Sequence, residues 1–307
     1  MGLNTLEYTE LMAPKLNQQI IRESTSGWME DNATKLGEPI YNGGKEVKLP
    51  TISTTGLGDY DRDKGFNRQG KVTLEYTPYT MTQDRATTFH LDAMDVVETK
   101  FVTSSGSVIK DFQTRNVIPE IDAYRYSALA AKAKAVAQTE AATLTVDTAL
   151  NKFREHVDAI RDYVGQEMPL LCTLPSVVLR LIEDNKTFTK QFDIAGFEQG
   201  KISLRLKVLD NVFFRVVPSE RLWDKYIFAT GETEFGFKAD TLGGAKAINW
   251  IICPKELPMA ISRTDTLRVF DPMTNQNAHA WKIDYRKYHD LWVLKNDLKS
   301  LMVCTKA

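Results

Sequence analysis

Three aspartates alternate along a polar, glycine-bearing stretch in the pattern by which carboxylates ligate calcium. Asp59, Asp61 and Asp63 would occupy the first, third and fifth positions of a calcium-binding loop. Such a loop needs glycine at its sixth position and a bidentate glutamate at its twelfth, and this chain has Lys64 and Gly70 there. We therefore predict a solvated loop in place of a metal site.

Basic residues are interleaved with these acids. Arg62, Lys64 and Arg68 balance the charge of the loop. Because the signs alternate, the loop is suited to pairing with the charges of a neighbouring molecule.

The sequence GGKE at 43–46 is similar to the end of a phosphate-binding loop, in which backbone N–H groups and a lysine surround phosphates. The match is incomplete, because Pro39 stands at the upstream glycine position and Glu46 at the magnesium-binding Ser or Thr position. A turn that leads into a strand is the better interpretation.

Residues typical of enzyme sites are dispersed. The four histidines have no second metal ligand at helical or hairpin spacing, and no serine lies in a nucleophile-elbow pattern. Cys172, Cys253 and Cys304 each lie in or beside an apolar run, which is typical of buried reduced thiols and fits a reducing cytoplasm. We expect no catalytic, cofactor-binding or metal-ligating residues. A hydrolase on an α/β scaffold is an alternative that the missing nucleophile pattern disfavours.

The composition is that of a globular protein, with 43% hydrophobic and 26% charged residues among 307. A formal net charge of -1 gives no reason to expect strong attraction to nucleic acids or membranes. No apolar run approaches the about 18 residues of a membrane span, and the first residues lack a signal-peptide core. Loose contact with phosphates is plausible for a few dispersed basic residues. These are Arg22, Lys132, Lys134, Arg161, Arg205 and Lys207.

Two strand-like stretches surround the acidic loop. Residues 46–52 and 71–77 alternate apolar and polar side chains, which predicts a hairpin. At about 3.3 Å per residue, each arm with half of its link could extend on the order of 40 Å. Because an isolated hairpin is marginal in water, we expect it to lie on another surface. Residues 3–36, with sparse helix-like apolar spacing, also need a surface to order them.

The longest predicted helix runs over 117–138. Pro119 suits its first turn, and Glu120 and Asp122 suit the positive end of the helix dipole. Small and apolar residues recur at spacings of three and four, which makes a stripe narrow enough for another backbone to lie close against it. The stripe consists of Ile121, Tyr124, Ala128, Ala131 and Ala135.

A second helical pattern precedes the long helix. It covers 89–112, with Asp92 as a candidate cap. The two patterns together predict a nearly continuous helical region that bends at 115–118.

The rest of the chain predicts an α/β block at 145–260, followed by a tail of strands. Its helices are expected at 147–163, capped by Asp147, and after Pro175 to about Glu183. Predicted strands cover 168–174, 204–210, 212–218, 226–230, 247–254, 266–272, 279–288, 291–294 and 300–305.

Four stretches of the chain resemble the major capsid proteins of tailed bacteriophages, in the expected order. They are residues 82–99, 116–130, 247–261 and 268–294. The resemblance implies an α+β fold of the Hong Kong 97 type. It further implies an N-terminal arm at 1–42, an E-loop hairpin at 43–78, a P-domain with a spine helix at 79–144, an A-domain at 145–260, P-domain return strands at 261–292 and a terminal A-domain strand at 293–307. With the long helix as this spine, its stripe of small and apolar residues is expected to pack under the P-domain strands at 266–292.

The resemblance implies a structural role. A major capsid, or head, protein assembles into hexamers and pentamers of an icosahedral shell that encloses double-stranded DNA, in the virion and first in the cytoplasm of the host bacterium. The implied partners are other copies of the chain, a portal protein, packaged DNA bound without sequence specificity and a decoration protein. A separate scaffolding protein is expected because the arm begins almost at Met1.

The shell is expected to be held together without covalent crosslinks. Contacts between subunits are expected from the arm and the E-loop, at Trp28, Lys45, Asp59, Asp61, Arg62, Asp63, Lys64, Phe66 and Arg68. The alternative is the shell protein of an encapsulin-like nanocompartment, which shares the fold class and encloses an enzyme.

Overall fold

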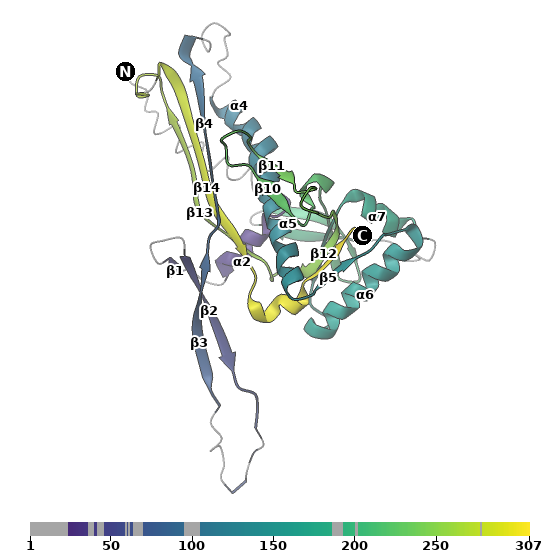
Figure 1. The fold of residues 1–307 in the computed structure, drawn as a ribbon. Helices are drawn as coiled ribbons and strands as arrows, with labels where there is room; N and C mark the ends of the chain where they lie inside the picture. Colours follow the sequence, from purple (N-terminus) through teal and green to yellow (C-terminus); the bar gives the residue numbers. More distant parts are fainter. Residues whose placement is uncertain are drawn as a thin grey trace.

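A computed structural model of the chain shows three connected parts: an α/β body, a long narrow sheet beside it, and a hairpin that projects away from both (Figure 1). The structure describes residues 24–35, 40–41, 46–58, 60, 62–63, 70–94, 105–185, 193–199, 202–276 and 278–307.

The body is built on a mixed seven-stranded sheet in the order β5-β15-β12-β6-β9-β8-β7. Its strands are β5 Thr139–Ala141, β6 Leu170–Leu174, β7 Asp193–Gln199, β8 Ile202–Leu209, β9 Val212–Val216, β12 Ile248–Pro254 and β15 Met302–Thr305. Strands β6 and β12 are buried along their whole length. This explains why they read as continuous apolar runs in the sequence.

Helices cover both faces of this sheet. On one face, α6 (Val146–Val164) and α7 (Ser176–Glu183) pack on alternate strand residues such as Cys172 and Trp250. On the other face, the intervening residues Leu171 and Ile251 pack against the long helix. Since neighbouring strand residues point to opposite faces, a single apolar run supplies both cores. The cap of α6 is Thr145, whose hydroxyl accepts from Thr148 N, in place of the predicted Asp147.

The long helix is one piece of a longer helical region. It consists of α4 (Ser105–Phe112), a π-helical stretch η1 (Gln113–Val117) and α5 (Ile118–Ala135). Pro119 has no N–H for the carbonyl four residues earlier, and its ring crowds that carbonyl. This accounts for the widened helix before Pro119, at the place where the sequence predicts a bend. The helix ends earlier than predicted, with Ala137 at φ 58.

The narrow sheet has three antiparallel strands in the order β13-β14-β4. They are β13 Met259–Phe270, β14 Ala280–Trp292 and β4 Gln83–Asp92. The prediction that a helix begins at Phe89 is wrong, because Phe89 pairs with Ile283 in this sheet. Asp92 does receive a backbone N–H, from Met94 at 2.8 Å. The rest of that helical pattern, at 95–104, lies outside the described residues.

The projecting hairpin pairs β2 (Glu46–Thr54) with β3 (Val72–Thr80), and a short β1 (Ile40–Tyr41) adds to β2. Three smaller elements complete the body: the hairpin of β10 (Tyr226–Phe228) and β11 (Phe237–Ala239), and the 3-10 turns η2 (Ser219–Arg221) and η3 (Lys295–Ser300). At the N-terminal side, α2 (Trp28–Lys35) packs against the start of β13.

Candidate functional site

The projecting hairpin is attached to the molecule at its base. Val47 of β2 is fully buried and packs with Met81, Met259 and Trp292, and the rings of Tyr79 and Trp292 lie 5.6 Å apart. The pairing is regular from Glu46 opposite Thr80 to Thr54 opposite Val72. The base is therefore held by a hydrophobic cluster, while the outer part of the ribbon extends away from the body (Figure 1).

One face of β3 exposes a row of apolar side chains. Val72, Leu74 and Tyr76 are 71%, 53% and 47% exposed. Alternate residues of a strand share a face, so the three side chains lie in line. Because an isolated two-stranded ribbon gains little stability from its own contacts, this row is a candidate for burial against another surface.

Two hydrogen bonds between Thr55 and Lys71 join the ends of the link, just beyond the last paired residues of the strands. Thr55 N donates to Lys71 O at 3.0 Å, and Lys71 N donates to Thr55 Oγ1 at 2.9 Å. A Cβ on Gly70 would lie 2.9 Å from the same oxygen, so glycine allows this close approach.

Two residues of the predicted contact set, Arg62 and Asp63, are described in the link, and both are exposed in a turn. Their role in contacts between subunits stays a prediction. The other link positions in that set lie outside the described residues, as does Lys45; they are Asp59, Asp61, Lys64, Phe66 and Arg68.

The structure contradicts the prediction that Trp28 contacts a neighbouring subunit. Its side chain is 1% exposed and packs in the same chain against Tyr126 and Leu129 of α5. The segment around Trp28 has too few apolar residues for a core of its own, which predicts that Trp28 packs against another surface. That surface is the long helix of the same chain.

The residues of the predicted stripe on the long helix have different environments. Ile121 packs with Leu267 of β13 and with Ile283 and Tyr285 of β14. Tyr124 and Ala128 are half-buried. Ala131 and Ala135 are exposed, and the buried residue at this end is Ala133. The helix has cores on several sides, so its buried residues do not form one narrow stripe.

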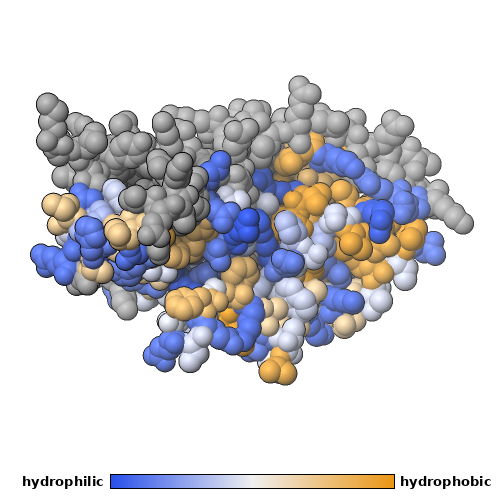
Figure 2. All heavy atoms as spheres, turned by 90° about the horizontal axis from the view of Figure 1, so that it is seen from above, coloured by the Kyte–Doolittle hydropathy of each residue, from blue (hydrophilic) through white to orange (hydrophobic). Residues whose placement is uncertain are grey.

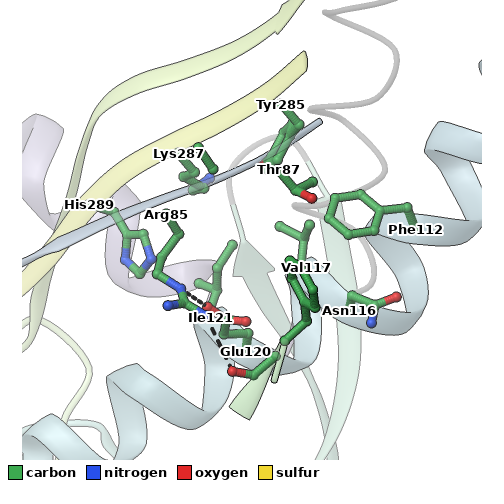
Figure 3. A pocket seen from close by; sticks show the side chains of 13 residues that line it. Arg85, Thr87, Phe112, Asn116, Val117, Glu120, Ile121, Tyr285, Lys287 and His289 are labelled. Carbon is green, nitrogen blue, oxygen red and sulfur yellow. Dashed lines mark hydrogen bonds and ion pairs between the residues drawn. The ribbon is translucent and has the colours of Figure 1, made fainter. Parts of the chain in front are cut away.

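Arg85 of β4 joins three elements beside a cavity of about 110 Å³ (Figure 3). Its guanidinium donates to Glu120 Oε1 of α5 at 2.6 Å and to the carbonyls of Ala229 and Gly236, in the turn of the β10–β11 hairpin, at 2.6 and 3.2 Å. Lys287, which also lines the cavity, is paired with Asp265 at 2.9 Å. The charges around this cavity are therefore used to hold strands, helix and hairpin together.

Burial favours the neutral form of several titratable side chains. Burial raises the pKa of Tyr285, and burial together with Arg125, Lys287 and Arg85 lowers the pKa of His289 well below its usual range. The three cysteines are free and buried, and burial raises the pKa of Cys253 to about 12. This suppresses the thiolate, which is the nucleophilic form.

His156 has a structural environment. Its Nε2 lies 2.8 Å from Glu140 Oε2, and its Nδ1 accepts from Trp250 Nε1 at 3.0 Å. These bonds connect α6 to β5 and β12. Among the described residues, no group of three His, Cys, Asp or Glu side chains is arranged to hold a metal ion.

Outside the hairpin, apolar side chains are exposed on the body. Seen from above, hydrophobic residues gather toward the right of the view among hydrophilic ones (Figure 2). The large exposed apolar residues of α7, β9 and the region around β10 and β11 are Val177, Val216, Ile227, Phe235 and Leu242. Among the described residues, no helix is long and apolar enough to cross a bilayer.

Comparison with known proteins connects this geometry to a fold. No protein-family model and no curated protein matches the chain. Solved structures do match, among them one titled Gordonia phage Cozz, with 12% identity, a TM-score of 0.56 and coverage of 91% of this chain and 87% of that one. The mature capsid of bacteriophage PhiM1 matches with 11% identity, a TM-score of 0.55 and coverage of 87% and 84%.

The capsid of cyanophage P-SCSP1u matches with 12% identity, a TM-score of 0.52 and coverage of 88% and 85%. At these identities the likeness concerns the fold. The chain therefore has the α+β fold of tailed-phage capsid proteins over about 90% of its length, as the sequence resemblance predicts.

Proposed function

We propose that this chain is the major capsid protein of a tailed bacteriophage, a structural protein without enzymatic activity. In this role it assembles into hexamers and pentamers of an icosahedral shell around double-stranded DNA. The single observation that supports it best is the projecting hairpin with an exposed apolar row, carried on a capsid-protein fold that extends over most of the chain.

The surface that receives the hairpin belongs to a second copy of the chain. Leu74 is 53% exposed, so burying its remaining surface contributes roughly half of the 1.5–3 kcal/mol for a whole leucine side chain, or about 1 kcal/mol. Each subunit contributes the same ribbon and receives the same ribbon, so modest contacts are repeated around a closed shell. Arg62 and Asp63, in the exposed link, add charge pairing at the same contact.

The domain division follows the same reasoning. In the proposal the arm covers 1–42, the E-loop 43–78, the P-domain 79–144 and 261–292, and the A-domain 145–260 with its terminal strand at 293–307. The three-stranded narrow sheet with Ile121 beneath it supports the P-domain, and the seven-stranded sheet supports the A-domain.

The other partners follow from enclosing a genome. They are a scaffolding protein, a portal protein, packaged DNA and a decoration protein. With a formal net charge of -1, contact with DNA is local and independent of base sequence. Assembly takes place in the host cytoplasm, and the product is the virion shell.

The test is whether the purified full chain forms closed particles. We expect electron microscopy to show icosahedral shells, and particles isolated from phage-producing cells to contain nuclease-protected DNA. A chain that stays monomeric at every concentration and salt condition, with and without a co-expressed scaffolding protein, contradicts the proposal. Particles that enclose a protein cargo without DNA favour the nanocompartment shell.

A further inference from the structure

A single buried carboxylate on the long helix binds three consecutive residues near the N-terminal end of the described chain. Asp122 has no exposed surface. Its Oδ1 accepts from Ser24 Oγ at 2.7 Å, from Ser26 N at 3.0 Å and from Ser26 Oγ at 2.5 Å. Its Oδ2 accepts from Thr25 N at 3.0 Å and Thr25 Oγ1 at 2.8 Å. Arg221 supplies one further donor, at 2.9 Å.

Neighbouring cations bind the carbonyl groups of two of the same three residues, Ser24 and Ser26. Arg125, one turn further along α5, donates from Nη1 to Ser26 O at 3.3 Å and pairs through Nη2 with Glu30. Arg215 of β9 donates to Ser24 O at 3.1 Å. The segment is thus bound through its backbone as well as its hydroxyls.

The residues that follow are docked by other means. Trp28 and Met29 are buried in the core between α5 and the large sheet. Further on, Asn32 Nδ2 donates to the carbonyls of Lys255 and Pro258 at 2.7 and 2.9 Å. Residues 24–35 therefore form one docked segment, which we call the N-terminal plug. Asp122 of α5 binds the first three residues of this plug.

The donors to Asp122 are unevenly distributed. Of the six hydrogen bonds described above, five come from residues 24–26 and one comes from Arg221. If the plug left, the carboxylate would keep one of these partners in a buried position, and an ion buried with unsatisfied bonds is strongly disfavoured. Docking is therefore cooperative: the buried carboxylate and the docked plug require each other.

We propose that Asp122 is the positioning residue that anchors the N-terminal plug to the long helix. The carboxylate does this by accepting the two backbone N–H groups and three hydroxyls of residues 24–26. The consequence for assembly rests on the proposed function, because it makes Asp122 the residue that fixes the 24–35 part of the arm on its own subunit. The anchoring itself does not depend on that function.

Hydrogen exchange of the full-length chain tests the anchoring. In Asp122→Asn, one acceptor oxygen becomes an NH₂ group that faces donors it cannot satisfy. We expect amides of the plug, residues 24–35, to exchange at least about tenfold faster, while amides of β6 and β12 keep their wild-type rates. Asp111→Asn is the matched control, because Asp111 is an exposed carboxylate on α4 paired with Arg115. It is expected to leave the plug unchanged.

A second variant changes the plug and leaves the helix intact. Ser24→Ala, Thr25→Val and Ser26→Ala together remove the three hydroxyl donors, and we expect the same local increase in exchange. If Asp122→Asn does not fold, exchange in the plug of this triple variant tests the anchoring instead. Unchanged exchange in the plug, or an equal increase in the plug and in β6, overturns the proposal, because the first shows no anchoring and the second shows only a general stabilising role.

Particle formation is measured separately on the same variants. If wild-type chains form shells and Asp122→Asn chains with a loosened plug do not, the anchor positions the arm for assembly. If the variant forms normal shells, its role in assembly is refuted. If wild-type chains form no shells, the proposed function fails while the exchange result still decides the anchoring.

Discussion

His289 is a buried histidine surrounded by positive charge. Its side chain is 3% exposed, and within the described residues its Nδ1 has no hydrogen-bond partner. Burial lowers its pKa, and the positive charges of Arg125, Lys287 and Arg85 lower it further. The folded protein therefore keeps this imidazole neutral at pH values where an exposed histidine is charged.

This environment predicts acid sensitivity. The pKa of His289 is lower in the folded chain than in the unfolded chain, where it is about 6.5. Above that value both states are neutral and stability is unaffected. Below it only the unfolded state binds the proton, so the free energy of unfolding falls by up to about 1.4 kcal/mol per pH unit until the folded pKa is reached.

Urea unfolding at several pH values between 5 and 8 measures this effect. In His289→Gln the decrease below pH 6.5 is expected to become shallower, whereas His90→Gln, which changes an exposed histidine on β4, leaves it unchanged. Equal pH dependence in wild type and His289→Gln would contradict the assignment.

The two alanines near the end of α5 have opposite environments. Ala133 is fully buried against the large sheet, and Ala131 is exposed. Replacing Ala133 by Phe should overpack the core and cost about 1–3 kcal/mol of unfolding free energy. Ala131→Phe should change it by less than about 0.5 kcal/mol. Thermal or denaturant unfolding of the two variants checks the difference, and a similar loss in both would show that Ala131 is not on a free face.

Sequence spacing alone could not separate these two residues. A period of three and four identifies one face only when a helix is buried on one side. Here the sheet covers one side, the plug and the narrow sheet cover others, and the buried set includes Asp122 and Arg125. In the sequence, a buried charged residue has the same pattern as a residue on a solvated helix face, so the spacing does not identify Asp122 as an anchor. The run of three hydroxyl residues, Ser24, Thr25 and Ser26, is the sequence feature that indicates its partner.

At the scale of elements, strands with their own periodicity were predictable. The alternation at 46–52 and 71–77 predicts β2 and β3, which the structure confirms with two or three more residues each. The short β5 has three residues and no periodicity to detect. In β4, half-buried and exposed residues alternate, but polar side chains occur on both faces, and the pairing with β14 that defines the strand is distant in the sequence.

The hairpin makes a prediction at this scale. Leu74→Lys with Tyr76→Lys places two charges in the exposed apolar row, so burial of that row against a second copy would carry a large desolvation cost. We expect a folded chain with an unchanged melting temperature and at least tenfold less particle formation, measured by light scattering and electron microscopy.

The matched control for the hairpin is Glu75→Lys, which changes charge on the neighbouring position of the same strand. It points to the opposite face, so particles should form as in wild type. Loss of particles in both variants would assign the effect to charge on the hairpin in general and contradict the role of the apolar row.

At the scale of the whole molecule, the order of strands in the large sheet was beyond sequence reasoning. The α/β block was predicted, and its helices and buried strands are found close to their expected bounds. However, β15 lies between β5 and β12, and each pairing joins segments far apart in the chain. Such contacts depend on which apolar surfaces meet after the chain folds, and no local pattern encodes them.

The separation of hairpin and body makes a prediction for the intact molecule. Deleting residues 53–70 removes the outer link and leaves the base cluster of Val47 and Trp292 in place. We expect a soluble chain with the wild-type melting transition of the body and no shells. Replacing 56–69 by a glycine–serine linker of equal length serves as the control for the link sequence. Normal particles from the deletion would refute the role of the hairpin.

The position of β15 also has a consequence for how the protein is made. β5 is at the edge of the sheet, with β15 as its neighbour in the strand order, and β12 presents an open edge until residues 302–305 arrive. Translation that stops before Met302 therefore yields a chain that lacks β15, so β5 and β12 have no strand between them. In the proposed function, such interrupted products lack the native surface of a subunit, and we expect them to be absent from shells.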